Sequence, residues 1–349
     1  MSEECFYKKE VEDLDQTLPV FIVEQYLQGD VDLGDYTLNK VIDETSMSLV
    51  VRAKKDDKIC AMKIPKVHKQ SLIERLETEK KALERCSHQN IVRLLDSSEN
   101  PPYLVLEYLH GKPLSRYSGN EHHQKEFAYD FIELAAQAAL ALEHMHSKNI
   151  IHRDIKPGNL LNTPEGIKII DFGVSLIDRE DDPDYLLGTP AYMAPEQAMD
   201  PSKVGPCSDI YSLGLTLNEL IIGKRALPEC QITPQKIKAW AEEIPPEDPS
   251  KNPAIGPLAP IIKKAYNPDP EKRYQSALDF YNALSTILEI AERRGWVRGQ
   301  LLDSKDWPYE DNSTIPDNCK TAYLARTQAT TKQDHHSLMR NYNHRTKDL

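Results

Sequence analysis

Three side chains with hard oxygen atoms lie close together in the middle of the sequence. The segment "IIHRDIKPGNLL" carries Asp154 and Asn159, and the strand-like "IKII" is followed by "DFG", which begins at Asp171. Mg²⁺ prefers such oxygen ligands, and its sites usually combine one or two carboxylates with substrate phosphates. Phosphoryl transfer requires mainly metal, positioning and charge stabilisation, so the spacing indicates a phosphoryl-transfer site. A solvated loop with unrelated acids would not explain the order of these segments.

A lysine in an apolar strand is the second candidate for chemistry. In "ICAMKIP", Ala61 and Lys63 share one face of the predicted strand. A lysine there needs an anionic partner, because burying an unpaired ion is costly. The next predicted helix supplies Glu79 within an apolar stripe, which predicts a Lys63–Glu79 pair that leaves the lysine able to reach phosphate oxygens. The alternatives are a purely structural ion pair, or a lysine that extends outward to solvent.

The elements that position these residues fall into two groups. Residues 35–108 alternate apolar runs with one helical segment, which predicts a small, mostly antiparallel sheet with one helix. Residues 112–290 are mainly helical in pattern, and the helix through "FIELAAQAALALEHMH" is expected to end near Asn149 in a left-handed cap. Residues 1–34 form an acidic extension, and residues 291–349 a polar, partly disordered tail. The fold class is therefore α+β, with a hinge near 108–113.

Composition limits the remaining possibilities. A formal net charge of −12 argues against a nucleic-acid or anionic-membrane binding protein. No signal peptide or membrane span is recognisable. The six cysteines have no CxxC spacing, which favours free thiols in a reducing cytoplasm over a metal site or disulfides.

Read in order, several segments resemble one known family. They are "AMK", Glu79, "HRDIKPGN", "DFG", "GTPAYMAPE", "SDIYSLG" and "DPEKRY", and they are similar to the motifs of eukaryotic-type (Hanks-type) serine/threonine protein kinases over residues 35–290. The resemblance implies a bilobal fold with ATP between the lobes, and the last motif is most similar to bacterial members. It also implies that Asp209 and a Glu196–Arg273 pair brace the structure.

The resemblance also implies roles for individual residues. Asp154 would be the catalytic base, and Lys63 would hold the α- and β-phosphates while paired with Glu79. Asn159 and Asp171 would bind Mg²⁺, with Mn²⁺ as a substitute. Lys156 would lie beside the transferring phosphate. Together with Thr189, it would mark a preference for Ser/Thr rather than Tyr. The adenine site would consist of the gatekeeper Leu106, the Glu107 carbonyl, the Leu109 N–H group and a sandwich of Val50, Ala61 and Leu161. These three apolar residues fit equally well as ordinary core.

The loop over the phosphates departs from the family pattern. Asp43, Thr45 and Ser48 occupy the positions of three glycines, whose backbone N–H groups approach phosphates closely. One interpretation is a working kinase with lower ATP affinity. The other is a pseudokinase scaffold that binds a partner, although the lysine and both aspartates that pseudokinases typically lose are present.

The activation segment, residues 171–196, departs as well. Between Leu176 and Gly188 there is no Ser or Thr, while "IDREDDPDY" is rich in acids. In kinases of this type the arginine at the position of Arg153 usually pairs with a phosphorylated loop residue. One of the carboxylates of Asp178, Glu180, Asp181, Asp182 or Asp184 could replace that phosphate. A solvated acidic loop is the alternative.

The sequence therefore predicts a cytoplasmic, ATP- and Mg²⁺-dependent kinase for Ser/Thr residues of protein substrates, with autophosphorylation as an option. Partner docking is expected through the extension 1–34 or the tail 291–349. A small-molecule phosphotransferase is disfavoured by Lys156 and "GTPAYMAPE".

Overall fold

The structure is a computed structural model that describes most of the two predicted groups of elements. The described residues are Leu33, 35–45, 47–66, 69–118, 128–178, 187–225, Thr233, 235–237 and 259–293. Most of the extension, the acidic run 179–186 and residues 294–349 lie outside this part of the chain.

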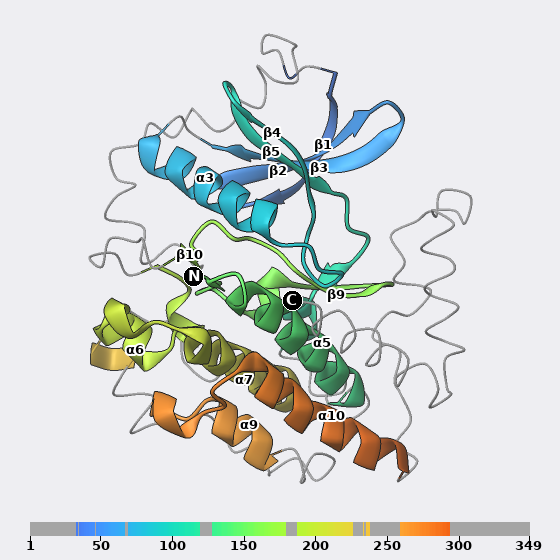
Figure 1. Cartoon of the computed structure of the whole chain (residues 1–349). Coiled ribbons are helices and arrows are strands. Elements are labelled where there is room, and N and C mark those ends of the chain that lie inside the picture. Colours follow the sequence, from blue (N-terminus) through green and yellow to red (C-terminus); the bar gives the residue numbers. More distant parts are fainter. Residues whose placement is uncertain are drawn as a thin grey trace, which may run out of the picture.

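The first group forms a five-stranded antiparallel sheet with one helix on it (Figure 1). The sheet order is β1-β2-β3-β5-β4. The strands are β1 (Thr37–Glu44), β2 (Ser48–Lys55), β3 (Lys58–Pro65), β4 (Leu94–Glu99) and β5 (Pro102–Glu107), and the helix is α3 (Gln70–Arg85). The helix contacts β3, β4 and β5, so it covers one face of the sheet.

Strand β3 shows why this sheet can position a charged group. Cys60, Met62 and Ile64 lie in an apolar cluster with β2 and β5 residues on one face. Ala61 lies in the cluster that includes α3, and Lys63 follows two residues later on that same face. The alternation read from the sequence is thus present.

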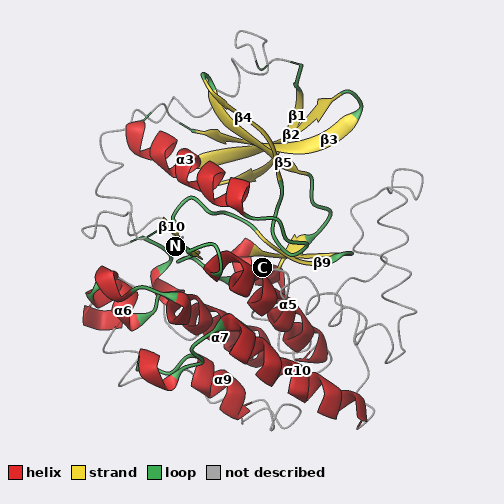
Figure 2. Cartoon of the chain, in the orientation of Figure 1, coloured by secondary structure: helices red, strands yellow, loops and turns green. Residues whose placement is uncertain are grey.

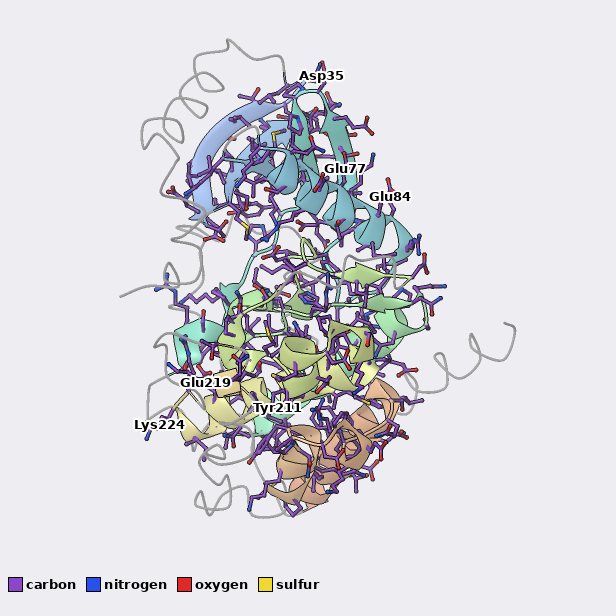
Figure 3. All side chains as sticks on the ribbon, turned by 90° about the vertical axis from the view of Figure 1, so that its left-hand side faces the viewer. Asp35, Glu77, Glu84, Tyr211, Glu219 and Lys224 are labelled. Carbon is purple, nitrogen blue, oxygen red and sulfur yellow. The ribbon has the colours of Figure 1, made fainter. Side chains whose placement is uncertain are left out.

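Helix α3 separates its acidic residues by their position on the helix. Glu77 and Glu84 lie on the exposed side, where Figure 3 labels them. Glu79 is buried with Leu76 and Leu83, on the side that faces the sheet.

The second group is mainly helical and lies below the sheet (Figure 2). Its α-helices are α5 (Ala128–His146), α6 (Pro195–Met199), α7 (Pro206–Ile222), α9 (Ala259–Ala265) and α10 (Ala277–Arg293). Single 3₁₀ turns span η2 (Leu114–Tyr117), η3 (Pro157–Asn159), η4 (Pro190–Tyr192), η5 (Pro201–Lys203) and η8 (Pro270–Lys272). Two small sheets carry the site loops: β6 (Lys112–Pro113), β8 (Leu160–Thr163) and β9 (Gly166–Ile169) form one, and β7 (Ile150–Ile151) and β10 (Leu176–Ile177) form the other.

Helices α5 and α7 form the centre of this lobe. Both are buried over most of their length, and α7 contacts α5, α9 and α10. After α5 the chain turns at Asn149, whose φ of 57° gives the expected left-handed conformation. The fold is the predicted bilobal α+β architecture.

Two further features concern the lengths of the helices. No helix in the described ranges has the length and apolarity to cross a bilayer. Helix α10 continues to Arg293, three residues into the segment predicted as the polar tail, and this helix packs on α5.

Candidate active site

Lys63 is held between two carboxylates where the lobes meet. Its Nζ atom lies 2.6 Å from Oε2 of Glu79 and 2.9 Å from Oδ1 of Asp171. Strand β3 supplies the lysine, α3 supplies Glu79, and the segment after β9 supplies Asp171. The predicted Lys63–Glu79 pair is therefore present, and it joins elements of both lobes.

Burial and charge act in opposite directions in this triad. Burial would lower the pKa of Lys63, but Asp171 and Glu79 together raise it above its usual range, so the ammonium persists. Burial favours a raised pKa for Asp171, but the Lys63 cation outweighs it and lowers the pKa below the usual range. For Glu79, 1% exposed, burial dominates and raises the pKa. The Asp171 side chain is 39% exposed and ionised, as a cation ligand must be.

Asp154 is oriented through both of its carboxylate oxygens. Its Oδ1 accepts a hydrogen bond from the Thr189 backbone N–H at 2.7 Å, and its Oδ2 accepts one from Asn159 Nδ2 at 2.9 Å. Lys156 Nζ lies 3.2 Å from Oδ2 and also donates to Thr189 Oγ1 at 2.6 Å. Asp154 thus contacts Asn159, Lys156 and Thr189, and Lys156 contacts Thr189 as well.

The loop that carries Asp154 is fixed from below by a buried carboxylate. Asp209, at 0% exposure, accepts backbone N–H bonds from His152 and Arg153, each at 2.9 Å. His146 Nε2 lies 2.9 Å from the same carboxylate. Burial would raise the pKa of Asp209, but the hydrogen bond with His146 and the electrostatic effect of the His146 and His152 side chains lower it. The expected bracing role matches these contacts.

The backbone is strained at two positions of the site. Arg153 and Asp171 have φ values of 64° and 66°, in the left-handed region that non-glycine residues seldom adopt. Strain of this kind persists where surrounding contacts enforce it, and it concentrates at functional sites.

The donor set suits a hard cation. Within the described ranges no group of three or more His, Cys, Asp or Glu side chains could hold a metal alone. Asp171 offers a carboxylate, and Asn159 uses its amide nitrogen on Asp154, which leaves the amide oxygen as a ligand. One carboxylate and one amide fit Mg²⁺, which keeps waters and takes phosphate oxygens from its substrate.

The residues expected around adenine lie near one another on the sheet and hinge. Ala61 pairs with Leu106 across β3 and β5, and Val50 pairs with Lys63 across β2 and β3. Val50, Ala61, Leu106 and Leu109 all belong to the same apolar cluster or pack against it. Leu161, on β8, is half-buried. The structure brings the four sheet and hinge residues together, while the role of these residues and of Leu161 in binding adenine stays a prediction.

The end of the activation segment is fixed by two devices. Gly188 has a φ of 113°, and a Cβ atom there would lie 2.6 Å from the Arg153 carbonyl oxygen, so only glycine fits. Farther on, Arg273 forms a bidentate pair with Glu196 at 2.7 and 2.8 Å, both side chains being buried. The expected structural pair is thus present.

The acidic candidates of the activation segment fall mostly outside the described residues. Glu180, Asp181, Asp182 and Asp184 lie in the run 179–186, so the phosphate-replacement hypothesis stays a prediction. Asp178 is described, and its carboxylate pairs with Arg85 at the end of α3.

Comparison with known sequences decides the family. A family model described as "Protein kinase domain" matches residues 36–283. The chain belongs to the protein kinase family.

Several curated relatives of this protein kinase domain come from bacteria. "Serine/threonine-protein kinase Pkn1" of Myxococcus xanthus is 33% identical over 230 residues, 62% of this chain and 32% of the relative. "Serine/threonine-protein kinase PksC" of Streptomyces coelicolor is 31% identical over 265 residues, which are 70% of this chain and 47% of the relative. "Serine/threonine-protein kinase PknA" of Mycobacterium tuberculosis is 31% identical over 272 residues, which are 73% of this chain and 61% of the relative. The kinase chain therefore spans about a third to three fifths of the length of these relatives.

Sequence reasoning missed two ion pairs around the kinase site. Lys168 on β9 lies 2.7 Å from Glu107, so the hinge residue with the expected adenine carbonyl is tied to the lower lobe by its side chain. Arg85 contacts Asp178 at 2.5 Å and links α3 to the activation segment. Only the opposite charges could have signalled these pairs, and many other residues offered the same charges.

Proposed function

We propose that this protein kinase transfers the γ-phosphoryl group of ATP to Ser or Thr hydroxyls of protein substrates. The observation that carries the proposal is the orientation of Asp154. Both of its oxygens are held, by the Thr189 N–H group and by Asn159 and Lys156. A carboxylate fixed in this way can accept the proton of an attacking hydroxyl, and correct geometry is the first requirement of a general base.

Charge stabilisation would come from residues on both sides of that base. Lys63 stays cationic between its two carboxylates and would bind the α- and β-phosphates. Lys156, which contacts both Asp154 and Thr189, would neutralise charge on the transferring group. Bound Mg²⁺, or Mn²⁺ in its place, would neutralise the β- and γ-phosphate oxygens. Asn159 and Asp171 would hold this ion.

The substrate class rests on a contact and on the relatives. The Lys156–Thr189 hydrogen bond joins the catalytic loop to the "GTPAYMAPE" segment, which forms the surface next to Asp154. The names of the bacterial relatives specify serine/threonine kinases. We therefore assign protein Ser/Thr hydroxyls, rather than Tyr or metabolites, as acceptors.

The surroundings of the enzyme are also part of the proposal. A cytoplasmic location is supported by the free thiols of Cys60, Cys86 and Cys207. Docking of a partner through the extension 1–34 or the tail 291–349 remains part of the proposal. Leu33, which is 5% exposed in the apolar cluster on the outer face of the sheet, attaches the end of the extension to the sheet. The kinase domain is assigned to residues 35–290.

The test is phosphosite mapping of a generic protein substrate, such as casein, after incubation with the full chain, ATP and Mg²⁺. We expect new phosphate on Ser and Thr, and none with an Asp154→Asn control. Phosphotyrosine alone, or phosphate only on added metabolites, would contradict the assigned substrate class. No transfer under any condition would favour the scaffold interpretation.

A further inference from the structure

The turn between β1 and β2 is closed by the side chain of Thr45. The Thr45 backbone N–H donates to the Ser48 carbonyl at 2.9 Å, which completes a tight turn. The Thr45 hydroxyl oxygen then accepts two more backbone N–H groups, from Met47 at 3.2 Å and from Ser48 at 3.0 Å. The same hydroxyl lies 3.2 Å from the Ser48 carbonyl, to which it can donate. The Thr45 hydroxyl therefore accepts both of these N–H groups.

These two donors are the groups that a phosphate would otherwise use. Successive backbone N–H groups in a turn form an anion-binding concavity, and a glycine-rich loop offers them to the phosphates of a nucleotide. At this tip the Met47 and Ser48 N–H groups already point at Thr45 Oγ1. A phosphate oxygen must displace this hydroxyl before it can accept either bond.

The closed turn is also anchored to the rest of the lobe. The Lys66 backbone N–H donates to the Met47 carbonyl at 2.9 Å, and Lys66 Nζ pairs with Glu44 at 2.6 Å. The Arg75 guanidinium on α3 contacts the Met47 sulfur. Thr45, Met47 and Ser48 do not have the positive φ that would favour glycine. The turn is therefore a stable structure of its own, and it is not a strained copy of a glycine-rich loop.

We propose that Thr45 sets the affinity of this kinase for the phosphates of ATP. Its hydroxyl competes with the nucleotide for the Met47 and Ser48 N–H groups, so the triphosphate is held mainly by Lys63 and the metal ligands. This proposal rests on the proposed function, because it concerns the same nucleotide site. In the wild-type protein, the turn is therefore expected to favour ATP over adenosine only weakly.

The experiment compares Thr45→Val with Thr45→Ser in the full chain. Valine keeps the branched shape and removes the hydroxyl, whereas serine keeps the hydroxyl. Titration calorimetry measures the Kd for ATP with Mg²⁺ and, separately, for adenosine. Thr45→Ala provides a second variant without the hydroxyl, and thermal unfolding without nucleotide confirms that all proteins are folded.

We expect Thr45→Val and Thr45→Ala to bind ATP about fivefold to tenfold more tightly, the equivalent of about one freed hydrogen bond. Adenosine affinity should not change, and Thr45→Ser should match wild type. Equal or weaker ATP binding by both variants without the hydroxyl would overturn the role of Thr45, as would an equal gain for adenosine.

Phosphate transfer measured on the same samples separates the two proposals. Tighter ATP binding by Thr45→Val without transfer by any protein would support the role of Thr45 and refute the proposed function. Phosphate transfer with no effect of the Thr45 hydroxyl on the Kd for ATP would support the proposed function and refute the role of Thr45. Absence of ATP binding by every protein would refute both.

Discussion

Replacing Arg273 with methionine removes the cation of a buried ion pair and keeps a side chain of similar length. Arg273 is 0% exposed in its side chain and Glu196 5%. The guanidinium binds both Glu196 oxygens and also donates to three backbone carbonyls, at 2.6 to 3.1 Å. In the variant, Glu196 keeps only the Ser208 hydroxyl, which donates to it at 2.7 Å.

The cost follows from leaving a buried carboxylate without its partner. Breaking one side of a buried pair costs roughly 3–5 kcal/mol. For a domain of this size that corresponds to a fall in Tm of roughly 6–20 °C. Because the hydrogen-bond partners of Arg273 and Glu196 do not include Asp154, the loss should appear in stability before it appears in the activity of the folded enzyme.

The assay is thermal unfolding at pH 7, followed by far-UV circular dichroism. Lys272→Met is the matched control: it breaks the neighbouring Lys272–Asp269 pair, whose side chains are 70% and 43% exposed, and Tm should not change. The double variant Arg273→Met with Glu196→Gln should lose less than the sum of the two single variants, since no unpaired charge remains. A Tm for Arg273→Met equal to that of the control, or strictly additive losses, would refute the reasoning.

Three further predictions concern the site and its surroundings. Thr189→Ala removes the hydroxyl that accepts a hydrogen bond from Lys156 and should lower kcat about tenfold, whereas Thr189→Ser should keep the wild-type kcat. Equal kcat values for the two variants would contradict a role of this hydrogen bond in catalysis. Glu79→Gln should lower kcat/KM for ATP about tenfold, because its hydrogen bond with Lys63 loses one charge. Glu77→Gln, at an exposed position of the same helix, is the control. Similar kcat/KM values for the two variants would count against a role of the Lys63–Glu79 pair. Burial and a neighbouring histidine lower the pKa of His88 from 6.5 to about 4, so its contribution to stability is present above pH 6.5 and is lost towards pH 4. The urea midpoint of His88→Gln should therefore depend less on pH than that of wild type. An equal dependence of both midpoints on pH would exclude His88 as the source.

Much of the fold followed from local patterns. The alternation along β3 placed Ala61 and Lys63 on one face, and the stripe on α3 placed Glu79 opposite them. These are short-range consequences of strand and helix periods, which the sequence displays directly. The family was confirmed because its motifs occur in order along the chain.

Contacts that depend on the packing of distant segments could not be predicted in the same way. Glu107 and Lys168 are 61 residues apart, and their pairing depends on how the hinge lies against β9. The loss of glycines was visible at Thr45, but a sequence does not show where a hydroxyl points. The interpretation of lower ATP affinity therefore rested on the missing glycines alone, without the hydrogen bonds that close the turn.

The most direct test of the account is intact-mass measurement of the full chain with ATP, Mg²⁺ and a generic Ser/Thr protein substrate, beside Asp154→Asn. The account predicts added phosphate on the substrate, or on the chain itself, with wild type and none with the variant. Absence of added phosphate with wild type, or equal phosphate with Asp154→Asn, would contradict the claim that Asp154 and its neighbours form a working phosphoryl-transfer site.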